Sequence, residues 1–275
     1  MIRDIAGRQN HSVKLARKLQ KKKHRRERGL LVGEGMDLLR AALAAGADVR
    51  EVLVRRALVG DLPPALVRRA TSAKHAGGGG LDLGVCDDET MAYASSLGGS
   101  ADVIFICPEP AWNLNDLGLA DGVTLVLAGV GDPGNVGTLV RSCAAFGANG
   151  VICTPGTADP YSPKAMRGGM GAQFVVPVVT EVTPADLDAR IGKIAVPAGA
   201  VPQVLVADSH QGDDVQTLHP DRGVLVVLGA ERTGAAEEWG SAGRVTVPQS
   251  GFDSLNVAMA GTILLYELTR KLAGK

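Results

Sequence analysis

Short, continuous runs of Val, Leu and Ile recur from residue 123 onward and alternate with segments that have the composition of helices. Strands that are apolar on both faces are typical of a parallel sheet covered by helices on each side. The runs predict strands at 123–128, 151–153, 174–179, 204–207, 224–228 and 244–247. We therefore expect an α/β fold with a parallel sheet, and ligands bound at the carboxyl ends of its strands.

The last long segment, roughly residues 254–272, predicts a helix whose first half is almost wholly apolar. Such a helix must be buried, either in its own core or in a subunit interface. We expect Asp253 or Ser254 to cap this helix, which would place Asn256 in its first turn. A polar side chain among apolar neighbours needs a hydrogen-bond partner, so Asn256 is expected to bond to a ligand or to backbone.

Residues 30–107 predict a smaller α/β unit ahead of this domain. Strands are expected at 30–32, 49–54 and 103–107, and a helix at 36–45 is closed by Gly46. The glycine run at 77–80 is expected to form a mobile surface loop. The length of 275 residues favours two domains. We predict one domain at 1–107, a linker at 108–120 and a second domain at 121–275.

The net charge of zero hides a strong asymmetry along the chain. Residues 1–30 hold eleven Lys or Arg against two acids, a charge of +9, so the remaining residues carry 18 basic and 27 acidic side chains, or −9. Such a cluster is typical of a surface that binds RNA or DNA, because each neutralised phosphate releases counterions. The alternative is a solvated helix that only aids solubility. Apolar Val13, Leu15 and Leu19 favour a helix docked by one side. The candidate RNA-binding residues are Lys14, Arg17, Lys18, Lys21, Lys22, Arg25, Arg26 and Arg28.

Other compositional features exclude several classes of protein. The N-terminus is charged where a secretory signal would be apolar, and no apolar run is long enough to cross a bilayer. The four cysteines form no C-x-x-C pair, and neither they nor the five histidines have the spacing of metal ligands. We therefore expect a soluble, cytoplasmic protein with no membrane association and no bound metal.

Three glycine-bearing turns follow three of the expected strands. The first, at 129–147, matches the dinucleotide pattern G-x-G-x-x-G, but no acidic residue follows the next strand to hold a ribose, and no Lys follows the glycines as in a P-loop. Its distinctive residues are Asn135 and Arg141, whose guanidinium could grip a phosphate or steady a developing oxyanion. The second turn, at 228–234, holds Glu231, and the third spans 247–258.

Together the three turns resemble the three signature motifs of the SpoU (TrmH-type) RNA ribose methyltransferases of the SPOUT superfamily, in the right order and spacing. The segment 10–54, with its Lys-rich start, resembles the ribosomal-protein-like substrate-binding domain that precedes the catalytic domain in many members. The resemblance implies a parallel sheet with a C-terminal trefoil knot, which general topology rules alone would disfavour. It also implies S-adenosylmethionine as methyl donor and a homodimer in which each active site is completed by the other subunit.

The resemblance also assigns roles by position. Gly229, Val247 and Leu255 are expected to contact the donor largely through backbone groups, and Pro248 to shape its pocket. The polar catalytic cluster is expected to comprise Asn135, Arg141, Glu231, Ser254 and Asn256. The expected substrate is RNA, with 23S ribosomal RNA as the first choice, whether for routine modification or for resistance to an antibiotic.

The expected reaction is an in-line attack of a ribose 2'-hydroxyl on the methyl carbon, which requires alignment and loss of the hydroxyl proton. A guanidinium is effectively always protonated, so we expect Arg141 to anchor an RNA phosphate and stabilise the forming alkoxide while a phosphate oxygen or water accepts the proton. Three alternatives remain: an oxidoreductase using Gly129–Gly134, a non-catalytic RNA-binding protein, and base methylation through a Cys nucleophile, for which Cys107 is the candidate.

Overall fold

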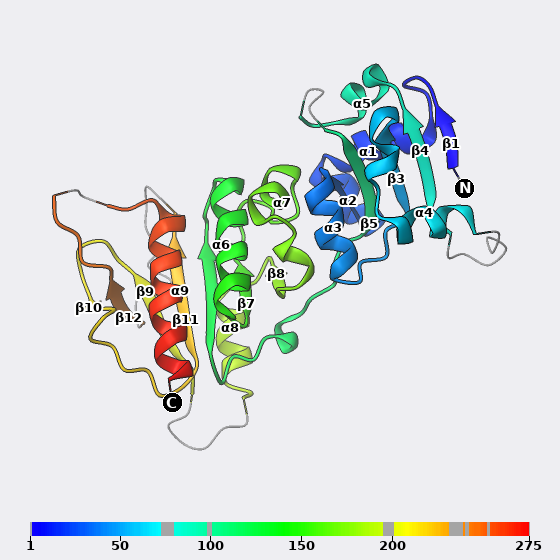
Figure 1. Cartoon of the computed structure of the whole chain (residues 1–275). Helices are drawn as coiled ribbons and strands as arrows, with labels where there is room; N and C mark the ends of the chain where they lie inside the picture. The colour runs from blue at the N-terminus through cyan, green and yellow to red at the C-terminus, as the bar shows by residue number, and fades with distance from the viewer. Residues whose placement is uncertain are drawn as a thin grey trace. The chain divides into compact units, whose positions relative to one another are not determined.

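The computed structural model describes residues 2–72, 80–97, 101–194, 201–230, 239, 242–251 and 254–274. The chain forms two compact units (Figure 1). Unit 1 comprises Met1–Pro110 and Tyr161–Phe174, and unit 2 comprises Ala111–Pro160 and Val175–Lys275. The chain therefore passes between the units three times along its length.

Unit 1 is built on a five-stranded mixed sheet in the order β1-β4-β3-β5-β2. Strand β5 runs antiparallel to β2 and β3, whereas β4 runs parallel to β1 and β3. The strands are β1 (Ile2–Ile5), β2 (Leu30–Glu34), β3 (Glu51–Arg55), β4 (Asp82–Cys86) and β5 (Val103–Pro108). The helices are α1 (His11–Leu19), α2 (Lys22–Arg28), α3 (Met36–Ala44), α4 (Pro64–Thr71) and α5 (Asp88–Ala94), with a 3-10 turn η1 (Arg56–Asp61).

Helix α1 docks on this sheet by its apolar side, as the sequence predicted. Val13 and Leu19 are fully buried and Leu15 is nearly so. They join a core cluster with side chains of β2, β3, β5 and α5. The charged side chains of α1 consequently project from a rigid surface.

A segment that lies between two strands of unit 2 in the sequence completes unit 1. This segment holds α7 (Pro163–Gly169) and a 3-10 turn η3 (Ala172–Phe174). Phe174 packs its ring against Phe105 of β5 at a centroid distance of 6.4 Å. A Cβ on Gly171 would lie 2.7 Å from the Cβ of Ala41 in α3, so the segment lies close against that helix.

Unit 2 is built on a seven-stranded sheet in the order β10-β12-β9-β11-β6-β7-β8, and all its strand pairs are parallel. This confirms the predicted parallel α/β fold. The strands are β6 (Val123–Ala128), β7 (Gly150–Cys153), β8 (Val178–Thr180), β9 (Gln203–Ala207), β10 (Asp213–Asp214), β11 (Val224–Gly229) and β12 (Gly243–Thr246). The helices are α6 (Pro133–Phe146), α8 (Pro184–Ile191) and α9 (Val257–Ala273), with a 3-10 turn η2 (Leu114–Asp116).

Helices cover both faces of this sheet. On one face Leu187 of α8 packs with Val126, Ile152 and Val227 of three strands. On the other face α6 and α9 lie side by side (Figure 1), with Leu139 and Leu264 fully or almost fully buried. Within the part of the chain that the structure describes, no helix is both long and apolar enough to cross a bilayer.

Two expected elements differ from the structure. The strand expected at 174–179 begins only at Val178, because Phe174 belongs to unit 1 and the chain must cross back before β8 starts. Helix α9 begins at Val257 rather than near Ser254. Residues 77–79 of the glycine run lie outside the described residues.

Candidate active site

The first and second glycine turns meet at the carboxyl ends of adjacent strands. Strands β6 and β11 are neighbours, and Gly229 pairs with Ala128 at their ends. Just beyond, Gly129 adopts a φ of 75°, and a Cβ on it would lie 3.8 Å from the Cβ of Ala230. The backbone N–H of Gly129 donates to Thr157 Oγ1 at 3.1 Å, which ties the loop after β7 to the same place.

The first and third turns meet through two asparagines. Asn256 Nδ2 donates to Asn135 Oδ1 at 3.3 Å. Asn256 Oδ1 accepts from the backbone N–H of Ala258 at 2.9 Å and that of Met259 at 3.3 Å. The expectation that Asp253 or Ser254 caps this helix is wrong: Asn256 is itself the N-cap, because its amide oxygen satisfies the first free N–H groups of α9.

Close packing of α9 on α6 produces this contact. A Cβ on Gly261 would lie 2.5 Å from methyl carbons of both Leu139 and Leu228, so only a glycine permits this approach. Ser142 and Thr262 hydroxyls lie 2.8 Å apart, and further along the Phe146 and Tyr266 rings meet edge to face. The two helices therefore begin side by side at the edge of the sheet.

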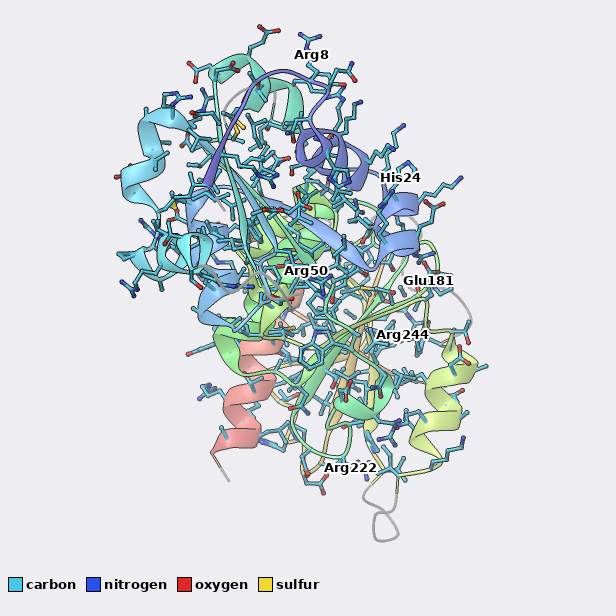
Figure 2. The ribbon with its side chains drawn as sticks, turned by 90° about the vertical axis from the view of Figure 1, so that its right-hand side faces the viewer. Arg8, His24, Arg50, Glu181, Arg222 and Arg244 are labelled. Atoms are coloured by element: carbon cyan, nitrogen blue, oxygen red, sulfur yellow. The ribbon has the colours of Figure 1, made fainter. Side chains whose placement is uncertain are left out.

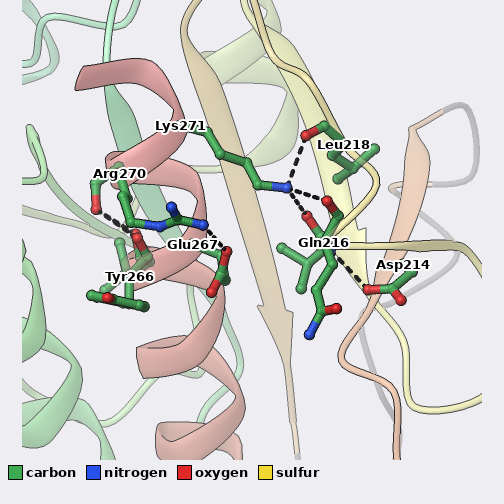
Figure 3. A network of polar contacts seen from close by, with 10 residues as sticks. Asp214, Gln216, Leu218, Tyr266, Glu267, Arg270 and Lys271 are labelled. Atoms are coloured by element: carbon green, nitrogen blue, oxygen red, sulfur yellow. Dashed lines mark hydrogen bonds and ion pairs between the residues drawn. The ribbon is translucent and has the colours of Figure 1, made fainter. Parts of the chain in front are cut away.

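The far end of α9 is held as well. Lys271 Nζ donates to the carbonyl oxygens of Val215 at 2.7 Å, Gln216 at 2.6 Å and Leu218 at 3.0 Å (Figure 3). The three carbonyls belong to the segment that follows β10. An ammonium with three donors is thus matched by three acceptors, which fixes the end of the helix opposite Asn256.

Arg141 is placed differently from Asn135 and Asn256. Its side chain is exposed and makes no hydrogen bond or ion pair with the other described residues. It follows Asn135 by six residues on α6, which is about 9 Å along the axis and about 120° around it. The structure therefore brings two of the expected catalytic residues together within one chain and leaves Arg141 free to act on something outside it.

Apart from Glu231, the remaining expected site residues lie around this edge. Val247 is half-buried, whereas Pro248, Ser254 and Leu255 are exposed, Leu255 by 40%. Glu231 lies outside the described residues.

Two features of this edge could not be predicted from the motifs. Strand β9 lies between β11 and β12, so the turn after it, which begins at Asp208, lies between the second and third motif turns. Asp208 accepts from the backbone N–H of His210 at 2.9 Å and of Gln211 at 3.1 Å, and from Arg244 at 2.6 Å (Arg244 is labelled in Figure 2). The N–H groups and Arg244 lower the pKa of Asp208. A turn-forming Asp-Ser directly after an apolar strand was the available signal.

The second missed feature is Gln249, in the loop that follows β12. Its Oε1 is buried and has no hydrogen-bond partner among the described residues. An unsatisfied buried acceptor is unfavourable and marks a place where a ligand donor can bind.

The cysteines offer no activated nucleophile. Burial raises the pKa of Cys107 to about 12 and that of Cys86 to about 11. All four thiols are buried. Base methylation through Cys107 is therefore disfavoured, because a reactive cysteine needs a lowered pKa and access. The described residues also contain no cluster of His, Cys, Asp or Glu that could hold a metal ion.

Helices α1 and α2 form a basic surface along one edge of unit 1, which Figure 2 shows between the labelled Arg8 and His24. Among the described residues, Lys14, Lys18, Lys21 and Arg28 form no ion pair. Arginines elsewhere on the unit face carboxylates within hydrogen-bond distance, in the pairs Arg3–Asp82, Arg50–Asp48, Arg56–Asp4 and Arg69–Asp48. The positive charges of Lys14, Lys18, Lys21 and Arg28 are therefore unmatched among the described residues.

Arg25 is an exception to the expected RNA-binding set. Its side chain is only 2% exposed. Its guanidinium donates to the backbone carbonyls of Leu19 at 2.7 Å and Gln20 at 3.0 Å, the free acceptors at the end of α1. We therefore assign Arg25 a structural role, because a guanidinium used in this way cannot reach a phosphate. Lys14, Arg17, Lys18, Lys21, Lys22, Arg26 and Arg28 are all exposed.

Unit 2 is a parallel sheet with polar groups gathered at its strand ends, and unit 1 carries a basic surface. Together these features define a class of α/β proteins suited to bind a small ligand and a nucleic acid. Residues 122–266 match the SpoU rRNA Methylase family, and residues 10–95 match an MRM3-like substrate binding domain. The chain belongs to the SpoU rRNA methylase family.

Individual relatives are similar over different extents. The 23S rRNA (guanosine(2553)-2'-O)-methyltransferase RlmP of Bacillus subtilis is 27% identical over 97% of this chain and 99% of its own length. The 23S rRNA (uridine(2479)-2'-O)-methyltransferase of Streptomyces viridochromogenes is 35% identical, and that match covers 50% of this chain and 49% of that protein. The crystal structure of an AdoMet-bound rRNA methyltransferase from Sinorhizobium meliloti superposes with a TM-score of 0.81 and 28% identity, covering 98% of both chains.

Proposed function

We propose that this protein transfers a methyl group from S-adenosylmethionine to a ribose 2'-hydroxyl of RNA, with 23S ribosomal RNA as the substrate. The observation that carries the proposal is the contact of Asn256 with Asn135, which joins the first and third motifs beside the end of β11. Family membership and the names of the relatives support the same reaction.

The strand-end edge fits the methyl donor. Gly229, Val247 and Leu255 offer backbone groups there, and the buried, unpaired Oε1 of Gln249 can accept a hydrogen bond from an amino group such as that of adenine. The donor supplies an already activated methyl group on a sulfonium. The chain therefore has to hold the donor, align the ribose and stabilise the oxygen that loses its proton.

Arg141 is proposed to hold the RNA phosphate and stabilise the forming alkoxide. Its exposure suits this role, because a phosphate can approach it from solvent. Since it forms no hydrogen bond to the asparagine pair of its own chain, we infer that it serves the site of a second copy of the chain.

A homodimer through α9 is consistent with this inference. Met259, Ile263 and Tyr266 recur at helical spacing and are 59%, 37% and 48% exposed. The opposite side of the helix is buried in its own core at Leu264, Leu265 and Leu268. A helix this apolar on its outer side is expected to pack against another subunit. The trefoil knot, a cytoplasmic location, and the roles of Glu231, Ser254 and Pro248 stay predictions.

The proposal is tested by incubating the purified chain with tritiated S-adenosylmethionine and 23S ribosomal RNA, followed by mapping of 2'-O-methyl sites. We expect radioactivity in RNA at a single ribose. Mapping in cells with and without the gene would then separate routine modification from antibiotic resistance. Calorimetry should show binding of S-adenosylmethionine and none of NAD. NAD binding, or no methyl transfer to any RNA, would contradict the proposal.

A further inference from the structure

Two arginines share one tyrosine ring at the edge of unit 1. The guanidinium carbon of Arg8 lies 5.0 Å from the centroid of Tyr93, and that of Arg17 lies 4.6 Å from it. Arg8 comes from the loop before α1, Arg17 from α1 and Tyr93 from α5. Three segments thus converge on a small stack of planar groups at the surface.

Three hydrogen bonds hold the segments of this stack together. The N–H of Gly7 donates to Thr90 Oγ1 at 3.0 Å, and Arg8 donates to Glu89 Oε1 at 3.1 Å. Arg17 Nη1 donates to the carbonyl oxygen of Tyr93 at 2.8 Å. The two arginine side chains are therefore held against the ring before any partner arrives, which reduces the entropy lost on binding.

Arg17 of the stack continues the unmatched charge of α1, whereas Arg8 is paired with Glu89. The side chain of Arg8 is 59% exposed, and Arg17 is exposed without a carboxylate partner among the described residues. Lys14, Lys18 and Lys21 extend the basic surface from Arg17 along the same helix and into the turn after it. Phosphates held by these lysines would place the adjoining nucleotides beside the stack.

We propose that the Arg8–Tyr93–Arg17 stack is a recognition site for an unpaired nucleobase of RNA. A base stacks on an exposed guanidinium plane, while the lysines of α1 hold the flanking phosphates. Sequence-selective proteins commonly read RNA through unstacked bases placed on aromatic rings or guanidinium planes, because bases in an RNA helix are hard to reach. The inference rests on RNA being the substrate, and it names the structural feature of the RNA that unit 1 selects.

The test compares binding of two RNAs with the same number of nucleotides, a hairpin with an unpaired loop and a fully paired duplex. The full chain should bind the hairpin more tightly. The double variant Arg8→Lys with Arg17→Lys keeps the charge but removes both guanidinium planes. This variant should lose about tenfold in affinity for the hairpin, with its affinity for the duplex and its salt dependence unchanged.

Two further variants sharpen the test. Tyr93→Phe keeps the ring and should retain the preference for the hairpin. Lys14→Gln removes one phosphate contact and should weaken binding of both RNAs alike, which no loss of stacking would do. The fluorescence of a 2-aminopurine placed in the loop should be quenched when the wild-type chain binds, and much less when the double variant binds.

The inference is overturned if the double variant keeps the hairpin-to-duplex ratio of wild type, or if it weakens both RNAs equally. Its failure is distinguishable from failure of the proposed function. A chain that methylates RNA but shows no preference for the hairpin retains its proposed activity and loses this site. A chain that prefers the hairpin but methylates no RNA keeps this site and loses the proposed activity.

Discussion

The two polar regions of this protein are built in opposite ways. The edge formed by α1 and α2 is rich in charge, and several of its lysines form no ion pair among the described residues. The strand-end edge of unit 2 relies on amides and backbone groups, and the exposed guanidinium of Arg141 forms no hydrogen bond to the asparagine pair. Affinity for a polyanion needs net charge at a surface, whereas methyl transfer needs a few groups at fixed positions.

Loss of Arg141 should break the catalytic region without affecting the binding region. We expect Arg141→Ala to lower turnover by about 100-fold or more, because it removes a stabiliser of developing charge. Donor binding by calorimetry should change little, and RNA binding by filter retention should weaken only by the loss of one phosphate contact. A variant that keeps more than about a tenth of wild-type turnover would show that Arg141 does not have this role.

Mixing two inactive variants should show whether Arg141 acts across subunits. Asn256→Asp keeps an oxygen to cap α9 but loses the N–H that bonds to Asn135. When Arg141→Ala and Asn256→Asp chains are combined, mixed dimers would hold one intact site if the two residues come from different chains. Recovered methyl transfer supports that arrangement, and an inactive mixture places both residues in the same chain.

Removal of charge from α1 and the turn after it should affect only the binding region. We expect the triple change of Lys14, Lys18 and Lys21 to Gln to weaken RNA binding roughly tenfold or more and to reduce the slope of log K against log salt by about 2–3. The matched control changes Arg3, Arg50 and Arg69 to Gln, which removes equal charge from residues that already face carboxylates. Equal losses in the two triples would show that binding depends on net charge alone.

Gly261 tests how the catalytic edge is positioned. Gly261→Val would drive its side chain into Leu139 and Leu228 and separate α9 from α6. We expect a loss of about 1–3 kcal/mol in the free energy of unfolding, with methyl transfer reduced as well. Ala260→Val on the same helix is the control, and an equal effect there would exclude close packing as the cause.

The smallest effect is expected at Asp208. Its pKa is lowered from the ordinary value of 3.8, chiefly by the N–H of His210 and further by Gln211 and Arg244. A lowered folded-state pKa contributes stability that is present above the unfolded-state pKa and is lost as the pH falls through the folded-state pKa. Asp208→Asn should therefore cost less than about 1 kcal/mol at neutral pH, as for other ion pairs near the surface. Thermal melts should show the difference shrinking below about pH 4, and a constant difference would contradict this account.

Much of the sheet of unit 2 could be predicted because its strands are apolar on both faces. The strand at 123–128 was predicted to the residue, and four others to within one residue at either end. The short strands β1 and β4 were missed, because their apolar residues alternate with other residue types or because they carry charge. An edge strand such as β1 shows no continuous apolar run. The start of the strand at 174–179 was wrong because no local signal tells that Phe174 packs in the other unit.

The sequence predicted which residues would meet at the strand-end edge better than it predicted their arrangement. Motif spacing selected Asn135 and Asn256, and the structure brings them together. Spacing could not say that Asn256 caps its helix, since Ser254 has an equally suitable side chain. Charge alone could not separate the buried Arg25 from its exposed neighbours, and the Asp208 turn belongs to no motif.

The segment Tyr161–Phe174, which completes unit 1, determines how such a protein could be divided or recombined. A fragment that stops at residue 110 would leave Phe105 without the ring that covers it and the outer side of α3 bare. The substrate-binding unit is therefore not one continuous segment, and a fusion or a gene rearrangement that joins the chain at a single point could not transfer it whole. To transfer this unit to another methyltransferase, α7 and η3 would have to be transferred too. They would have to be inserted in the sequence between two strands of the recipient's sheet.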